Sequence, residues 1–502
     1  MRRCGNREDW EELSEYMTKD VDKKEKGITV ADLRPEKVFY FFNEISRIPH
    51  GSGNTEQISG YLLDFARSRN LKAVKDGGGN IIIYADGTEG YEKSEPVIIQ
   101  GHMDMVCEKN EDCTKDMSAE GLDLRTDGEY LWAEGTTLGG DDGIAVAYIL
   151  ALLDSDDIPH PPIEAVITRD EETGMFGAED FDASLVRSKK VINIDSEEEG
   201  ILTVSCAGGI SGHCEVLLDA PCARAENVYE ITVSGLLGGH SGIDIGKGRQ
   251  NAFKLISNFL SEITDFCIAD INGGGKMNVI PNKASVIIGT ESDRIEELKS
   301  RVNEFNSIHY ASDPEIIFSV KNTDTAVLFY DKKNTDIILD FLADAPTGVL
   351  KWSENIEGMP ESSLNLGVFS VSDGKISADF LIRSNSDDGK TTAANQLEEF
   401  MLSKNGTLEL SSDYPSWTYR EVSPLRDLMS DVYCDMFGEK PVISGIHAGL
   451  ECGFFSKKIL DSDIVSFGPD IENIHTPSER LNIASAERTW EYLLEILRRC
   501  KT

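Results

Sequence analysis

The chain has 502 residues, of which 40% are apolar and 27% are charged, a composition that suits a globular protein with two or three domains. The 89 acidic residues outnumber the 49 basic ones, and the net charge of -40 disfavours DNA, RNA and anionic lipid as partners. No signal peptide is predicted at the start, the longest apolar stretch (144–153) is too short to span a bilayer, and the cysteines form no CxxC pair. These features predict a cytoplasmic protein with neither a nucleic-acid nor a membrane partner.

Helices and strands are predicted to alternate along the first part of the chain. After a polar extension over residues 1–33, apolar residues at helical spacing predict helices over 35–47 and 55–69. A glycine-rich turn at 139–143 precedes a third predicted helix, 144–153. Continuous apolar runs predict strands covered on both faces at 96–100, 163–168, 190–194 and 463–467. This alternation predicts an α/β domain with a mostly parallel sheet flanked by helices.

The pattern changes near residue 225, where alternating strands predict a smaller α+β domain inserted into the first. Strand, helix, strand, strand, helix and strand follow one another over 228–320, and a shorter similar set over 336–410 suggests two related halves. The predicted organisation is an extension (1–33), the first part of the α/β domain (34–224), the inserted α+β domain (225–411) and the second part of the α/β domain (412–502).

Ionisable residues follow the ends of several predicted strands. They are His102 and Asp104, Asp141, Glu171 and Glu172, Asp195, and His475. Because ligands bind at the carboxyl ends of the strands in an open α/β sheet, these side chains are expected to converge. Clustered acids without a cation would repel one another, whereas two imidazoles and three carboxylates suit two divalent ions with one bridging carboxylate.

The spacing within two of these pairs suggests separate roles. His102 and Asp104 point the same way in an extended chain, so Asp104 can orient the imidazole of a metal-bound His102. Glu171 and Glu172 are adjacent and diverge, so one can bind metal while the other acts as a base.

Each motif also has a plain structural interpretation. The Asp141–Asp142 pair is typical of a helix cap, and the Glu171–Glu172 pair of a solvated turn. The His102–Asp104 pair could be a surface or core pair, and His475 could be an ordinary loop histidine. Their shared position at strand ends is what favours a metal site.

Seven stretches together resemble peptidase family M20, and within it the aminoacyl-histidine (Xaa-His) dipeptidase branch. They are 100–106 (QGHMDMV), 137–144 (TLGGDDGI), 170–178 (DEETGMFGA), 194–200 (IDSEEEG), 238–242 (GGHSG), 363–367 (SLNLG) and 446–453 (IHAGLECG). The resemblance runs from about residue 35 to the end of the chain and implies a zinc-peptidase-like catalytic domain with an inserted lid domain.

The resemblance assigns the metal ligands. It implies His102, Asp141 and Asp195 on one ion, and Asp141, Glu172 and His475 on the other, with Asp141 bridging. It further implies Glu171 as the general base, Asp104 as the residue that orients His102, and a cis peptide between Asp141 and Asp142. The expected cofactor is a pair of Zn²⁺ ions, although Co²⁺ and Mn²⁺ suit the same ligands.

The resemblance also assigns residues of the inserted domain to the substrate. It implies that His240 stabilises the oxyanion and that Arg383 binds the free carboxylate, a task that suits a guanidinium fork. Asn278 and His447 are candidates for lining the substrate site. The alternatives are a loop histidine for His240, a surface arginine for Arg383, and loop or turn chemistry for the other two.

The expected activity is metal-dependent hydrolysis of Xaa-His dipeptides such as β-Ala-His. The alternatives are a nonspecific cytosolic dipeptidase, another amide hydrolase of the family such as a deacylase, and a noncatalytic metal-binding protein. The expected partner is a small peptide substrate. The inserted domain could pair two chains as a homodimer, or its two halves could imitate such a dimer within one chain.

Overall fold

The computed structural model describes residues 28–309, 313–323 and 327–501, so residues 1–27 of the predicted 1–33 extension lie outside them. The described residues form two compact units. The first contains 28–202, Val422–Val442 and 458–501, and the second contains Thr203–Glu421 and Ile443–Lys457. Among the described residues, no helix combines the length and apolar character needed to cross a membrane.

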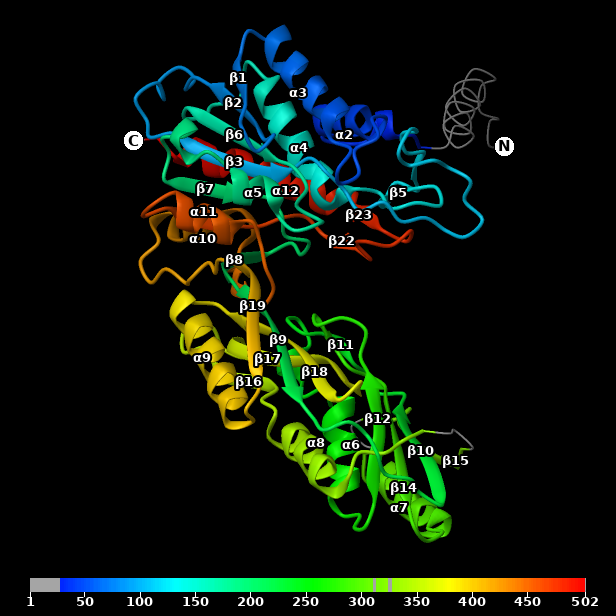
Figure 1. Ribbon diagram of the computed structural model, residues 1–502. Helices are drawn as coiled ribbons and strands as arrows, with labels where there is room; N and C mark the ends of the chain where they lie inside the picture. The colour runs from blue at the N-terminus through cyan, green and yellow to red at the C-terminus, as the bar shows by residue number, and fades with distance from the viewer. Residues whose placement is uncertain (1–27, 310–312, 324–326, 502) are drawn as a thin grey trace, which may run out of the picture. The chain divides into compact units, whose positions relative to one another are not determined.

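The first unit is built around six neighbouring strands of a sheet (Figure 1). They are, in order across the sheet, β1 (Lys72–Lys75), β2 (Ile81–Ala85), β6 (Ile163–Thr168), β3 (Val97–His102), β7 (Lys190–Asn193) and β21 (Asp463–Ser466). The strand order continues with β8 (Ile201–Cys206) and β20 (Val442–Ile446), whose residues from Thr203 and from Ile443 onward belong to the second unit. β6, β3, β7 and β21 run parallel, whereas β1 and β2 are antiparallel. β6, β3 and β21 are buried along their whole length, as their continuous apolar sequences predict.

Helices pack against this sheet as the sequence predicts, and the α/β fold class is confirmed. α4 (Gly140–Leu153) contacts β3 and α2 (Glu36–Ser46), and α3 (Glu56–Ser68) contacts β1 and β2. The remaining helical segments of the unit are η1 (Val30–Asp32), α5 (Phe176–Asp180), η2 (Ala183–Leu185), α10 (Pro424–Phe437) and α12 (Ile483–Arg499). A small sheet joins β22 (Ile471–Glu472), β23 (Arg480–Asn482), β5 (Tyr130–Ala133) and β4 (Leu124–Thr126).

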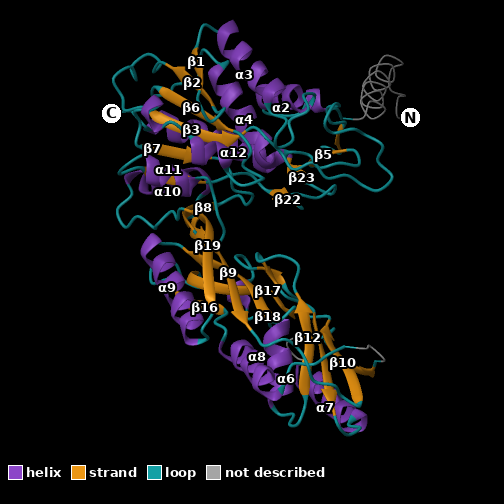
Figure 2. Cartoon of the chain, in the orientation of Figure 1, coloured by secondary structure: helices purple, strands orange, loops and turns teal. Residues whose placement is uncertain are grey.

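The second unit contains a nine-stranded antiparallel sheet with helices alongside it (Figure 2). Its strands are, in order, β15 (Ile317–Asn322), β10 (Asn227–Ser234), β14 (Ala284–Thr290), β12 (Cys267–Gly273), β17 (Pro360–Ser372), β18 (Lys375–Ser384), β9 (Gly208–Leu217) and β19 (Thr407–Tyr414), with β16 (Gly348–Trp352) on β17. Its helical segments are η3 (Ile245–Lys247), α6 (Ala252–Ser261), α7 (Ile295–His309), α8 (Lys332–Asp344), α9 (Asp387–Ser403) and, at its boundary, α11 (Cys452–Lys458). A separate pair joins β11 (Gly239–His240) to β13 (Val279–Ile280).

The unit boundaries differ from the predicted ones. The second unit begins at Thr203 instead of 225, ends its long segment at Glu421 instead of 411, and also takes in Ile443–Lys457. The early start follows from β9, which pairs along its length with β18 and therefore belongs to the antiparallel sheet. Its alternating burial resembles that of β10, but no break in the sequence separates it from β8.

Candidate active site

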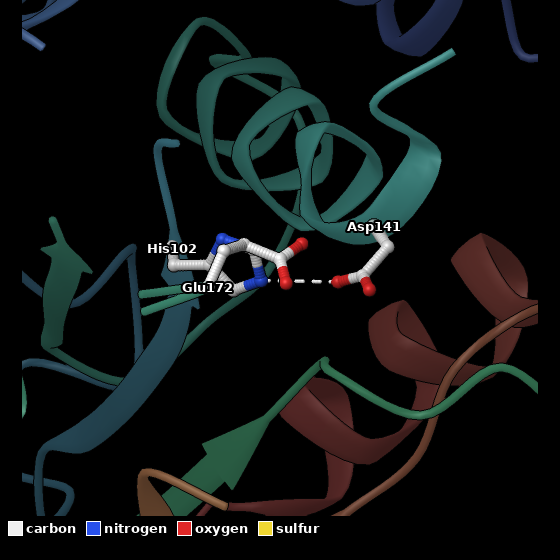
Figure 3. Close-up of side chains that lie close together, drawn as sticks. All are labelled: His102, Asp141 and Glu172. Atoms are coloured by element: carbon white, nitrogen blue, oxygen red, sulfur yellow. Dashed lines mark hydrogen bonds and ion pairs between the residues drawn. The ribbon is translucent and has the colours of Figure 1, made fainter. Parts of the chain in front are cut away.

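The candidate metal ligands all lie at the carboxyl ends of first-unit strands or on the loops beside them. His102 is the last residue of β3, Asp195 follows β7, and Glu172 lies in the turn after β6. Asp141 is in the first turn of α4, and His475 is on the loop between β22 and β23. Figure 3 shows the side chains of His102, Asp141 and Glu172 directed toward one another. The structure therefore brings together all five residues that were predicted to bind metal.

The carboxylate of Asp141 lies between the two histidines. Its Oδ1 is 3.0 Å from Nε2 of His102, and its Oδ2 is 3.2 Å from Nε2 of His475. Nε2 of His102 is also 3.6 Å from Oδ1 of Asp195, and Nε2 of His475 is 3.0 Å from Oε2 of Glu172. Each imidazole thus faces Asp141 and one further carboxylate, an arrangement that suits a bridging Asp141.

Two atoms of this cluster show that it fits a cation. Oε1 of Glu172 and Oδ2 of Asp195 are buried and have no hydrogen-bond partner among the described residues. A buried carboxylate oxygen without a partner is costly unless a cation or a proton neutralises it. His102, Asp141 and Glu172 offer ligand atoms within 4.8 Å of one another, as do His102, Asp142 and Asp195.

Asp142 was predicted only as a cap residue. Its Oδ2 accepts a hydrogen bond from the backbone N–H of His102 at 3.1 Å, so this oxygen already has a protein partner. The Asp141–Asp142 peptide is cis, as the family resemblance implied.

The electrostatics of the cluster follow from crowded charge in a buried place. Hydrogen bonds to Asp141 and Glu172 raise the pKa of His475 to about 11. Burial raises the pKa of Asp195 to about 6. Burial also opposes ionisation of Asp141, but hydrogen bonds from His102 and His475 outweigh it and lower the pKa of Asp141. Protonated histidines thus neutralise these carboxylates here. Divalent cations would supply that positive charge in a metal-bound site.

Asp104 serves two neighbours. Its backbone carbonyl accepts a hydrogen bond from Nδ1 of His102 at 3.0 Å, while its carboxylate lies 3.6 Å from the same nitrogen. The carboxylate accepts hydrogen bonds from Oγ of Ser52 at 2.8 Å and from the backbone N–H groups of Glu171 (3.0 Å) and Glu172 (3.4 Å). Asp104 therefore lies against His102 as predicted, and it also holds the turn that carries the two glutamates.

His240 and Arg383 come together in the second unit. Nη2 of Arg383 lies 3.3 Å from Nε2 of His240, and Nη1 donates to the hydroxyl of Tyr414 at 2.8 Å. Nδ1 of His240 accepts the backbone N–H groups of Gly242 and Ile243, both at 3.3 Å, which places the ring proton of a neutral His240 on Nε2. Nε2 of His240 and the adjacent Arg383 guanidinium are therefore both donors, an arrangement that suits an anionic oxygen that lies beside the two and accepts from each.

Asn278 and His447 lie in the same unit in different settings. Asn278 is half-buried, and its carbonyl accepts the backbone N–H of Ser241, the residue that follows His240. His447 is buried, and its ring nitrogens bond to Oγ of Ser363 and Oδ1 of Asn385, both at 2.8 Å. Burial and then the charge of Arg383 lower the pKa of His447 to about 3. Both ring nitrogens of His447 are thus engaged by protein groups.

Sequence reasoning missed three supporting residues: Ser52, Tyr414 and Glu479. Ser52 bonds to Asp104, and Tyr414 bonds to Arg383. Glu479 is buried and accepts backbone N–H groups from the segment that leads into Asp141. Their contacts join residues that are far apart in the sequence, so no local pattern could have identified them.

A sheet whose central strands are parallel, with histidines and carboxylates gathered at their carboxyl ends, is typical of α/β metal-dependent hydrolases. Comparison with known proteins agrees with this class. Peptidase family M20/M25/M40 matches residues 98–499, and the chain belongs to this family.

The comparisons identify two similar dipeptidases. Over 480 residues the chain is 36% identical to the cytosol non-specific dipeptidase of Escherichia coli (strain K12), covering 93% of this chain and 98% of that one. The aminoacylhistidine dipeptidase of Vibrio alginolyticus superposes with a TM-score of 0.87 at 33% identity, covering 94% of this chain and 98% of that one. The aminopeptidase PepT of Bacillus cereus shares the fold, with a TM-score of 0.55 at 13% identity over 94% of this chain and all of that one.

Proposed function

We propose that this chain is a metal-dependent dipeptidase that acts on Xaa-His dipeptides such as β-Ala-His. The observation that carries the proposal is the Asp141 carboxylate, which lies between the imidazoles of His102 and His475 with 3.0 and 3.2 Å contacts. The names of two similar proteins, a non-specific dipeptidase and an aminoacylhistidine dipeptidase, support the substrate class.

The proposed cofactor is a pair of divalent ions. His102, Asp141 and Asp195 would hold one ion, and Asp141, Glu172 and His475 the other. Zn²⁺ is the first candidate for imidazole and carboxylate ligands, and Co²⁺ and Mn²⁺ suit the same set. When bound, such ions supply Lewis acidity and lower the pKa of a water molecule toward neutrality.

Glu171 is the proposed general base. It shares a turn with Glu172, and Asp104 accepts the backbone N–H groups of both residues. The backbone from which the Glu171 side chain extends is therefore held next to the proposed metal ligands. In this role Glu171 would accept a proton from the attacking water and return it to the leaving amine.

His240 and Arg383 are proposed to bind the substrate. A neutral His240 has its ring proton on Nε2, since Nδ1 accepts backbone N–H groups, and so can donate to the oxyanion that forms at the scissile carbonyl. Arg383 is buried and would bind the free carboxylate of a dipeptide, which limits substrate length. Asn278 and His447 are proposed to shape this site, and the second unit is proposed to act as a lid that supplies it.

The 36% identical relative makes a broader dipeptidase the second candidate function. Its name states no preference for histidine, and the proposed chemistry at the metal centre would serve any dipeptide. The two candidates share one mechanism and differ only in the residue accepted after the scissile bond. We also propose a cytoplasmic location. Measurement of the mass in solution would distinguish a homodimer from a monomer.

A hydrolysis screen on metal-loaded protein tests the proposal. The substrates are β-Ala-His, Gly-His, Leu-Leu and N-acetyl amino acids, assayed before and after chelation. Faster cleavage of the two histidine dipeptides, abolished by chelation, supports the Xaa-His dipeptidase. Equal cleavage of Leu-Leu supports the broader dipeptidase, and cleavage of only the acetylated substrates supports a deacylase. Two bound ions with no hydrolysis would overturn the enzymatic proposal in favour of a noncatalytic metal-binding protein.

A further inference from the structure

The carboxylate of Glu479 lies against the start of helix α4. Its Oε2 accepts the backbone N–H groups of Leu138 at 2.8 Å and Gly139 at 3.1 Å. Its Oε1 accepts that of Gly140 at 2.7 Å and reaches that of Asp141 at 3.5 Å. One carboxylate thus engages four consecutive residues and ends at the candidate bridging ligand.

This contact takes the place of an ordinary helix cap. The first N–H groups of a helix lack partners within the helix and are usually satisfied by a side chain just before it. Gly139 holds the N-cap position and has no side chain, so Glu479 supplies the acceptors from a distant part of the chain. Glu479 is only 3% exposed, so water does not compete freely for these N–H groups.

The same short segment also carries His475. His475 faces the Oδ2 side of the Asp141 carboxylate at 3.2 Å, and the backbone N–H of Glu479 bonds to the carbonyl of Thr476 at 3.0 Å. Residues 475–479 therefore contact Asp141 twice, at its side chain through His475 and at its backbone through Glu479. A shift of this segment would move the bridging carboxylate and the second histidine together.

We propose that Glu479 is a positioning residue for the metal centre, which fixes the bridging carboxylate of Asp141 relative to His475 through the 138–141 backbone. The proposal rests on the proposed metal-dependent function and deepens it. Outer groups that orient metal ligands are typically worth about 10- to 100-fold in metal affinity or activity. A residue that merely capped a helix would change stability without this effect.

Glu164 offers a matched control, because it lies at the opposite end of β6 from the turn that carries Glu172. Glu164 lies near the start of β6, is 1% exposed, and accepts the backbone N–H groups of Arg187 at 2.9 Å and Ser188 at 3.0 Å. It is therefore a second buried glutamate that holds backbone, but it does so away from the metal ligands. Glu164→Gln and Glu479→Gln make the same chemical change in the two places.

The test measures Zn²⁺ affinity by chelator competition on the full-length protein, together with the thermal midpoint, kcat and KM. Glu479→Gln is expected to weaken Zn²⁺ binding roughly 10- to 100-fold and to lower kcat more than it raises KM. Glu164→Gln is expected to lower the thermal midpoint and leave Zn²⁺ affinity unchanged. Equal Zn²⁺ affinity in the two variants and the wild type would overturn the proposal.

A second variant covers the case in which Glu479→Gln does not fold. Glu479→Asp keeps the charge and withdraws the carboxylate by one methylene, so a smaller loss of Zn²⁺ affinity in the same direction is expected. Wild-type affinity in that variant overturns the proposal. Zn²⁺ affinity is measured without substrate, so the two proposals can fail separately. If Glu479→Gln binds Zn²⁺ more weakly but the metal-loaded wild type cleaves no dipeptide, the proposed function is refuted and this inference stands.

Discussion

Asp104 lies two residues after His102, and its carboxylate accepts a hydrogen bond from the backbone N–H of Glu171 at 3.0 Å. One aspartate therefore links β3, which carries the candidate metal ligand His102, to the turn that carries the proposed base. The link is buried, and Ser52 completes it by donating its hydroxyl to the same carboxylate at 2.8 Å.

Asp104→Asn tests this link. The asparagine keeps one acceptor oxygen but places an amide N–H₂ against the donors of the turn, so the Glu171 backbone should shift. We expect kcat to fall about 10- to 100-fold while the protein keeps its metal. Ser52→Ala, which removes one donor and no charge, should have a smaller effect. An unchanged kcat in Asp104→Asn, measured on metal-loaded protein, would show that Asp104 does not act through this turn.

Glu171→Gln tests the proposed base. The amide cannot accept the proton of water, so we expect kcat to fall by about 10²- to 10⁴-fold. Metal content should match that of the wild type, because Glu172 is the proposed ligand in this pair. Glu179→Gln, at an exposed glutamate of α5, is the control and should retain full activity. Near-normal turnover of Glu171→Gln with metal bound would remove Glu171 from the mechanism.

Arg383→Lys tests recognition of the free carboxylate. A guanidinium can pair with a carboxylate through two parallel hydrogen bonds and an ammonium cannot, so KM for a dipeptide should rise by roughly 10- to 100-fold. For the same dipeptide with an amidated C-terminus, Arg383→Lys should change KM little, because this substrate has no free carboxylate. Tyr414→Phe removes the hydroxyl that accepts from Arg383 and should shift KM in the same direction. Equal losses for the acid and the amide would refute this role.

The pH dependence of stability reports on His447. Burial, and then Arg383, hold its folded pKa at about 3, whereas an unfolded histidine titrates near 6.5. Between these values the unfolded chain binds a proton that the folded chain refuses, so stability falls as the pH drops below about 6.5. The slope from this one group approaches about 1.4 kcal/mol per pH unit.

Thermal midpoints at pH 7.5 and 5 check this prediction. His447→Gln should lower the midpoint at both values but show a smaller drop between them than the wild type. His213 is a control of opposite sign: a hydrogen bond to Asp379 raises its pKa, so the stability it contributes is present at low pH and lost as the pH rises. An identical acid-induced drop in the wild type and His447→Gln would show that His447 is not held neutral.

The convergence of the candidate metal ligands could be predicted from sequence because strand ends could be predicted. Continuous apolar runs located β3, β6, β7 and β21, and the carboxyl ends of parallel strands meet at one edge. His102, Glu172 and Asp195 follow those runs closely, so their convergence needed no knowledge of side-chain detail. His475 was placed beside them by the same rule, although its loop is longer.

Contacts that depend on register or on backbone geometry could not be predicted. Glu479 meets the 138–141 backbone only because the loop after β22 folds back on α4, and no local pattern encodes that approach. The contact between Arg383 and His240 likewise depends on how β18 and β11 are placed within the second unit. The early start of that unit was missed because only Ala207 separates β9 from β8, so the two strands follow each other almost directly in the sequence.

Anomalous scattering at the zinc edge, from crystals of the Zn²⁺-loaded protein, tests the central claim most directly. The account predicts two zinc peaks, one on each side of the Asp141 carboxylate. The first peak should lie beside His102 and Asp195, and the second beside His475 and Glu172. A single peak, or peaks that do not contact Asp141, would contradict it.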